Sequence, residues 1–383
     1  MSRRARIAIP AATAAAALAG AALLLSPGGA ASVAECRGGD AVDFACQERR
    51  YVELADTRGA AAALDDLAKS KRDSGFLRAA CHQLTHRIGR TAGADDGIDA
   101  FGDGDAVCGS GYYHGVTEAA MRRVGARAAT RQPAGVCATR RGRERADCIH
   151  GMGHGYMGVL ERDLRASLEG CDALRASRDR QGCYSGVFME NTMAAGDPDP
   201  DSLRPRDPLY PCAEVARRYR EACYERQSTY ALFVNDGDFR AVFGLCADVE
   251  RASRGSCHRG LGGDAAAETK DIEDLARQAR TRRGLCMLAD TSEARSACVA
   301  GAARVILQDL DGGPEQLDAL CTSFDARVTQ PQHAACLEAS ERAYRELLAE
   351  QTGGGPGGEA PAAAPDFVCH LEKAGRQPRS ERK

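Results

Sequence analysis

Cysteines recur along this chain at a spacing that constrains the fold more than any other feature. Six consecutive pairs, from Cys137 to Cys336, have only 10 to 14 residues between their two members. Successive pairs are separated by 22, 28, 22, 28 and 22 residues. Corresponding cysteines therefore recur every 75 residues, as from Cys137 to Cys212 and from Cys148 to Cys223. Such a fixed period is typical of repeat proteins, here with two hairpins in each period.

The short interval within each pair limits where its two members can lie. Two cysteines 11 residues apart on one helix would be about 16 Å apart along its axis, whereas a disulfide needs Cα atoms within about 7 Å. Each pair must therefore straddle a turn, and the charged intervening residues suit an exposed connection. The segments between the pairs are rich in Ala, Leu and Arg and are predicted to be helical, with a proline cluster at 205–211 in the first longer one.

The predicted fold is all-α, built of αα-hairpins that are each cross-linked by a disulfide and stacked into a solenoid or an α/α toroid. Cys108 lies 75 residues before Cys183, and Cys81 is its expected partner because no cysteine lies near position 96. Cys369 is left over, as a free thiol, in an intermolecular bridge, or as the partner of a cysteine assigned here to another pair. Each bridge is worth about 3 kcal/mol. The expected bridges are Cys36–Cys46, Cys81–Cys108, Cys137–Cys148, Cys171–Cys183, Cys212–Cys223, Cys246–Cys257, Cys286–Cys298 and Cys321–Cys336.

The N-terminal residues have the pattern of a secretory signal peptide, predicted to span 1–34. Three arginines within the first six residues precede an apolar run from Ala11 to Leu25, and small residues follow as far as Ala34. The run has 15 residues, whereas a membrane span needs about 20. A secreted product without a membrane span is therefore expected. In an oxidising compartment, the 17 cysteines indicate disulfides.

The expected domain organisation follows from these patterns. A disulfide-stapled helical domain covers 35–350, with histidine-rich units at 74–161 and regular repeats at 137–350. A Gly/Pro/Ala-rich linker is expected at 351–366, followed by a tail at 367–383. The formal net charge is −3 and the arginines are interleaved with acids, which argues against a nucleic-acid partner because phosphates need a basic face.

Disulfide-stapled helical hairpins in an exported protein resemble the cysteine-rich members of the Sel1-like repeat proteins, relatives of the tetratricopeptide repeats. The resemblance rests on the ladder from Cys137 to Cys336, about half of the chain. It implies a scaffold for protein interactions. The cysteine spacing is longer here than in those repeats, and no residue role is carried over.

Five of the eight histidines fall between positions 82 and 154. Two pairs have the His-x-x-x-His spacing, which places both imidazoles on one helix face and lets them chelate a metal ion. The predicted apolar stripes of these helices lie on the opposite side. Abundant glycines indicate close helix packing or room for a ligand. The candidate ligands are His82, His86, His114, His150 and His154. An isolated pair of this kind is more often incidental, and packing residues are the alternative interpretation.

An internal comparison sets these histidines apart from the repeat itself. His154 follows its cysteine by six residues, where later copies have Thr229 and Arg304. His150 corresponds to Glu225 and to an alanine. The histidines are thus an addition to a unit that is built without them. His258, His333 and His370 are scattered and are expected to be structural or exposed.

Two functional hypotheses follow. The first is a metal-dependent hydrolase or oxidase that uses zinc, copper or iron, the metals that imidazole ligands suit. Glu118 and Glu190 are then the candidate catalytic residues, as a carboxylate ligand or a general base. The second is an extracellular interaction scaffold without catalysis, whose partner is a protein, a peptide or a small molecule. No nucleophile motif or phosphate loop favours another enzyme class.

Overall fold

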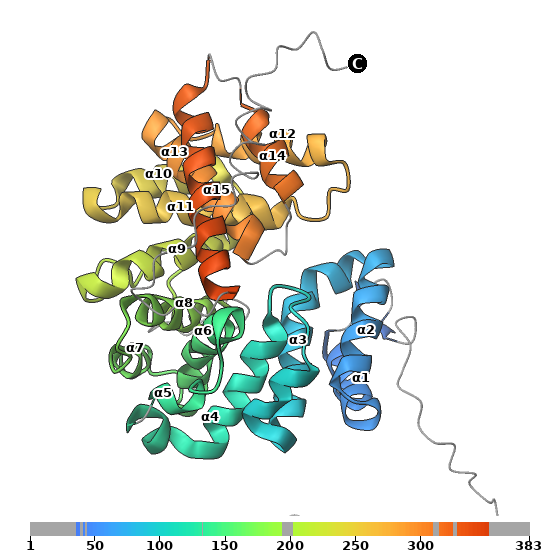
Figure 1. The fold of residues 1–383 in the computed structure, drawn as a ribbon. Helices are drawn as coiled ribbons and strands as arrows, with labels where there is room; N and C mark the ends of the chain where they lie inside the picture. Colours follow the sequence, from blue (N-terminus) through green and yellow to red (C-terminus); the bar gives the residue numbers. More distant parts are fainter. Residues whose placement is uncertain are drawn as a thin grey trace, which may run out of the picture.

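The computed structural model describes residues 36–38, 41–42, 44–131, 133–193, 202–308, 314–324 and 328–351. The expected signal peptide, the linker after its first residue, the C-terminal tail and Cys369 lie outside the described residues. The described chain is almost entirely helical, which confirms the all-α prediction (Figure 1). Two short strands, β1 (Arg37–Gly38) and β2 (Ala41–Val42), pair antiparallel ahead of the first helix.

Long and short helices alternate along most of the described chain. The long helices are α3 (Gly75–Asp96), α4 (Gly111–Arg131), α6 (Gly142–Val159), α8 (Ser177–Met193), α9 (Arg217–Val234), α11 (Arg251–Glu268), α13 (Ser292–Gln308) and α15 (Gln330–Gln351). The short helices between them are α5 (Pro133–Val136), α7 (Leu164–Asp172), α10 (Phe239–Asp248), α12 (Leu275–Cys286) and α14 (Pro314–Thr322). Before α3 come α1 (Phe44–Arg58), α2 (Ala60–Ser70) and the 3-10 turn η1 (Lys71–Asp73), and η2 (Gly97–Asp103) follows α3.

The long helices form one continuous row in which each packs against the next, from α3 to α15. The row curls back on itself, because α15 also contacts α6 (Figure 1). An ion pair of 3.6 Å between Arg78 on α3 and Asp271 after α11 joins two further distant points. The arrangement is therefore a curled row rather than an extended solenoid. Helices α1 and α2 also pack against α3.

All eight expected cysteine pairs are bridged in the structure. In every long helix from α6 to α15, the seventh residue is the second cysteine of a pair. In α3 the seventh residue is Cys81, the first cysteine of its pair. Eight bridges are characteristic of proteins that fold in an oxidising compartment. The 75-residue period itself stays a prediction from the sequence.

One detail of the predicted hairpins is wrong. The interval between the paired cysteines is not wholly an exposed connection, since the six residues before the second cysteine already belong to the long helix, as from Gly142 to Asp147 before Cys148. Each segment between pairs is likewise a long helix, a turn and, in most units, a short helix. Side-chain caps start several helices, because an unpaired backbone N–H needs an acceptor; Asp163 accepts from Ala166 at the start of α7.

The core is built from alanines, cysteines, aliphatic side chains and tyrosines, in a chain without tryptophan. Tyr112 and Tyr156 are fully buried, and each donates its hydroxyl to a backbone carbonyl, of Ala100 at 2.7 Å and of Ala129 at 2.9 Å. A buried phenol needs such a partner. The tyrosines therefore fill volume and also hold η2 and the C-terminal part of α4 in place.

Glycines bring the first long helices into backbone contact. A Cβ atom on Gly115 of α4 would lie 2.1 Å from the carbonyl oxygen of His86 on α3, and one on Gly111 would lie 2.6 Å from that of His82. Since both contacts advance in the same direction, α3 and α4 run parallel. Gly186 of α8 meets the carbonyl oxygen of His150 on α6 in the same way, at 2.0 Å. The glycines thus set the short distances between the helices that carry the histidines.

Candidate metal centre

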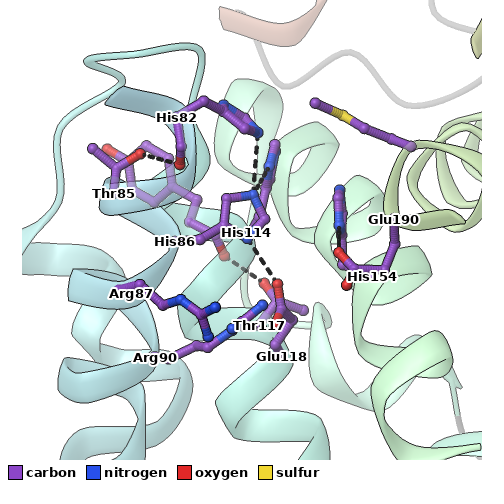
Figure 2. A network of polar contacts seen from close by, with 12 residues as sticks. His82, Thr85, His86, Arg87, Arg90, His114, Thr117, Glu118, His154 and Glu190 are labelled. Atoms are coloured by element: carbon purple, nitrogen blue, oxygen red, sulfur yellow. Dashed lines mark hydrogen bonds and ion pairs between the residues drawn. The ribbon is translucent and has the colours of Figure 1, made fainter. Parts of the chain in front are cut away.

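The curled row brings all five predicted histidines into one cluster. His82 and His86 come from α3, His114 from α4, and His150 and His154 from α6. Contacting imidazole rings have centroids 4.6–5.4 Å apart. His86, His114 and His154 are buried, whereas His82 and His150 are half-buried and form the accessible side. Figure 2 shows four of these rings converging from the three helices.

The α3 pair, His82 and His86, has both Nδ1 atoms engaged by oxygen acceptors. Nδ1 of His82 lies 2.7 Å from the carbonyl oxygen of Cys108, and Nδ1 of His86 lies 2.8 Å from Oε1 of Glu118. A carbonyl and an ionised carboxylate only accept, so each Nδ1 carries the proton and each Nε2 carries a lone pair. The two Nε2 atoms face each other at 3.1 Å (Figure 2).

The α6 pair, His150 and His154, also has facing Nε2 atoms, with a carboxylate behind one of its two imidazoles. Nδ1 of His154 donates to Oε2 of Glu190 at 2.8 Å, which leaves a lone pair on its Nε2. That Nε2 lies 3.2 Å from Nε2 of His150. The sulfur of Met189 lies 3.4 Å from the same His150 nitrogen. A carboxylate behind a metal-binding imidazole, which fixes its tautomer and orientation, is typical of metal sites.

His114 lies between the two pairs. Its Nδ1 is 3.3 Å from Nε2 of His86, and its ring is nearly parallel to that of His154, at an interplanar angle of 14°. The ligand atoms form three overlapping groups, each with all atoms within 4.8 Å of one another. The groups are His82–His86–His114, His114–His150–His154 and His86–Glu118–His154. The described residues therefore offer several sets of donors that could hold a metal ion.

The two candidate acids are both held by histidine. Burial would raise the pKa of Glu118, but the hydrogen bond from His86 and the charge of Arg90 lower it to about 2. Arg90 donates to the second oxygen of Glu118 at 2.5 Å. Burial likewise raises the pKa of Glu190, and the contact with His154 outweighs it and lowers that pKa overall. Both carboxylates are thus ionised and suited to orienting imidazoles, and Glu190 is the more exposed of the two.

Four of the imidazoles, those of His82, His86, His114 and His150, are held in the neutral form that binds metals. Burial is the largest cause that lowers the pKa of His82, His114 and His150 well below the ordinary value, and charge on neighbouring imidazoles adds to it. The pKa of His86 is also lowered by burial, although Glu118 opposes the shift. No deprotonation step therefore opposes metal binding near neutral pH.

Arg226 on α9 belongs to this site and is not among the residues expected from the sequence. Its charge lowers the pKa of both His82 and His150. Its Nε donates to the Ser185 hydroxyl at 2.8 Å, and no acid of the described chain pairs with it. A signal existed, because Arg226 stands three residues after its cysteine. Most long helices have glycine at that place, namely Gly111, Gly151, Gly186, Gly260 and Gly301.

The same helix face in the later units carries ion pairs and hydroxyls. Glu225, which corresponds to His150, accepts from Arg259 at 2.7 Å and from Arg304 at 3.0 Å. Thr229, which corresponds to His154, donates to Asp264 at 2.7 Å. Burial raises the pKa of Asp264 to about 6. In the later units, this helix face is therefore filled by a polar network of ion pairs and hydrogen bonds.

The remaining described histidines lie outside the cluster. His258 is buried on α11 and packs against the ring of Phe243, with centroids 5.9 Å apart. His333 is half-buried on α15, and His370 lies outside the described residues.

Comparisons of the chain with family models, with curated proteins and with solved structures gave no match. The resemblance to Sel1-like repeats therefore stays an expectation from the sequence. None of the described helices combines the length and hydropathy needed to cross a membrane.

Proposed function

We propose that this is a secreted metalloprotein whose transition-metal centre is built from the five clustered histidines. The observation that carries the proposal is the α3 pair. His82 and His86 point two Nε2 lone pairs at each other across 3.1 Å, with both ring protons committed to oxygen acceptors. Two acceptors at that distance repel unless a cation lies between them. Because burial disfavours a proton there, a metal ion is the cation that suits the site.

The spacing of the nitrogens supports this proposal. Metal–nitrogen bonds of about 2.0–2.1 Å place the ligands of a tetrahedral ion roughly 3.3 Å apart. The neighbouring histidine nitrogens lie 3.1, 3.2 and 3.3 Å apart. Imidazole-rich sites suit zinc, copper and iron, and a thioether such as that of Met189 favours copper. The half-buried side, formed by His82 and His150, leaves access for water or a substrate.

We further propose that the centre is catalytic, as a metal-dependent hydrolase or oxidase. Metal-bound water is a nucleophile near neutral pH, and an open coordination position serves either reaction. Glu190 is the better placed of the two acids for proton transfer, because Glu118 is enclosed by His86 and Arg90. An interaction scaffold is the competing function.

Metal analysis of the secreted chain tests the proposal. The oxidised protein is purified after growth in zinc, copper or iron, and its metal content is measured by elemental analysis. We expect stoichiometric metal in the wild type and its loss in a His114→Ala/His154→Ala variant. A His333→Ala variant serves as the matched control and retains the metal. Circular dichroism reports folding of each variant. If the wild-type protein contains no stoichiometric metal after growth in zinc, copper or iron, the proposal is contradicted. The interaction scaffold then remains as the function.

A further inference from the structure

We propose that the histidine cluster is a two-ion centre, with one ion bound at the α3 pair and a second at the α6 pair. This inference rests on the proposed function, since it assigns the number of ions to the same cluster. Each pair supplies two Nε2 atoms at the separation of neighbouring ligands on one ion, 3.1 Å for His82–His86 and 3.2 Å for His150–His154. The two pairs come from different helices.

The supporting carboxylates are duplicated together with the pairs. Glu118 on α4 accepts from Nδ1 of His86, and Glu190 on α8 accepts from Nδ1 of His154, both at 2.8 Å. In each case the acid comes from the next long helix in the row. The pair and the acid behind it therefore both occur twice in the cluster. The arrangement is thus a repeated half-site, each with a His-x-x-x-His pair and its own orienting acid.

His114 is placed to complete either half-site. It belongs to the donor group of the α3 pair and also to that of the α6 pair. Its ring contacts His82, His86, His150 and His154. In the described chain, by contrast, the ring of His82 contacts those of His86 and His114 and neither ring of the α6 pair. The outer ligands therefore diverge on either side of His114, as two ions about 3.5–4 Å apart would require.

The half-sites differ in their surroundings, so the two ions should bind unequally. The acid behind the α3 pair, Glu118, is 3% exposed, whereas Glu190 behind the α6 pair is 19% exposed. The α6 pair also borders the sulfur of Met189. An ion at the α6 pair is thus the more accessible and the more easily exchanged. Repulsion from the first ion further weakens binding of the second.

A zinc titration of the full oxidised chain tests the inference. The metal-free protein is titrated with Zn²⁺ alone by calorimetry, and bound zinc is counted by elemental analysis after gel filtration. His82→Asn and His150→Asn remove one half-buried ligand from each half-site, with His333→Asn as the control on α15. We expect two zinc ions in the wild type and the control, bound in two steps. Each half-site variant should retain one.

The outcomes separate this inference from the function on which it rests. One zinc per wild-type chain, lost or weakened in both half-site variants, would overturn the two-ion centre and leave a single-ion metalloprotein. No zinc in any form, with copper and iron also failing, would overturn both. Loading the wild type with Cu²⁺ adds a second measurement. Spin coupling between two copper ions in the electron paramagnetic resonance spectrum supports the inference, and an uncoupled signal at full loading contradicts it.

Discussion

A single guanidinium, that of Arg226, lies within electrostatic reach of His82 and His150. Its Nε donates to the neutral Ser185 hydroxyl, and its charge also lowers the pKa of Glu225 and Asp264, so these carboxylates offset part of that charge. Positive charge beside neutral imidazoles opposes a proton and a metal ion alike. In the proposed metal centre, Arg226 would therefore lower the affinity for the ion.

Replacing that charge should strengthen metal binding. For Arg226→Gln we expect the zinc affinity to rise about two- to five-fold, since one partly screened charge is worth roughly 0.5–1 kcal/mol. Competition with a chromophoric chelator measures the change. Arg240→Gln, which removes an exposed arginine on α10, is the control and should leave the affinity as it is. Equal or weaker binding in the Arg226 variant would show that its charge does not act on the ligands.

His258 makes the folded protein sensitive to acid independently of the cluster. Burial lowers the pKa of His258 to about 4, against about 6.5 in an unfolded chain. Between these values the unfolded state binds more protons, so stability falls as the pH drops from about 6.5 to 4. The loss reaches roughly 3 kcal/mol at the acid end. Urea unfolding of His258→Gln at pH 7 and pH 4.5 should show a smaller pH dependence than the wild type, and an equal dependence would contradict this assignment.

The candidate metal ligands could be predicted from single residues in the sequence. The residues that hold these imidazoles in place could not. The His-x-x-x-His spacing identified His82, His86, His150 and His154, because helical periodicity places such pairs on one face. Roles for Glu118 and Glu190 behind the imidazoles depend on contacts across helices, which leave no local spacing. Arg226 is an intermediate case. The sequence shows an arginine where most of the long helices have glycine, but it does not show that the side chain lies near the histidines.

Among the helices, close approach of parallel backbones decides whether the cluster forms. For Gly186→Ala, the added Cβ would meet the carbonyl oxygen of His150 at 2.0 Å. Separating α6 and α8 should cost about 1–3 kcal/mol and weaken zinc binding, because His154 would lose its register with Glu190. Thermal unfolding and zinc titration measure the two effects.

The matched control for that change is Gly244→Ala on α10. Its added Cβ meets nothing within 4 Å, so the helical preference of alanine should stabilise the protein by up to about 1 kcal/mol. Similar effects of the two substitutions would show that helix propensity, and not helix contact, dominates at Gly186.

Helix boundaries were less predictable than helix type. The cysteine interval required a turn, and the turn exists, but only in the first half of the interval. The reason lies in the packing: the bridged cysteine must reach the buried face of its long helix, so the helix starts six residues earlier, as Gly142 does for Cys148. The spacing of the cysteines alone predicts that a turn occurs between them. It does not predict where the following helix begins.

For the whole molecule, the spacing of the cysteines predicted the disulfide bridges. The curled arrangement of the long helices could not be predicted. Contact between α15 and α6 joins residues far apart in the sequence and has no periodic signature.

The disulfide bridges predict the number of free thiols. Because 16 of the 17 cysteines pair, we expect one reactive thiol, that of Cys369, in the denatured, unreduced chain. Ellman titration measures it, and more than one thiol per chain would break the pairing scheme.

The contact between Cys108 and His82 links two events in the life of the chain. The carbonyl that orients His82 belongs to a cysteine bridged to Cys81, the residue next to His82. For the exported metalloprotein proposed above, maturation should therefore run in a fixed order, with oxidation before metallation. A newly synthesised chain in a reducing cytoplasm would lack the Cys81–Cys108 bridge and thus the oriented His82 ligand. It would not compete for cytoplasmic metal. Loading would wait until export, where the supply of zinc or copper outside the cell, and not inside it, decides which ion the protein carries.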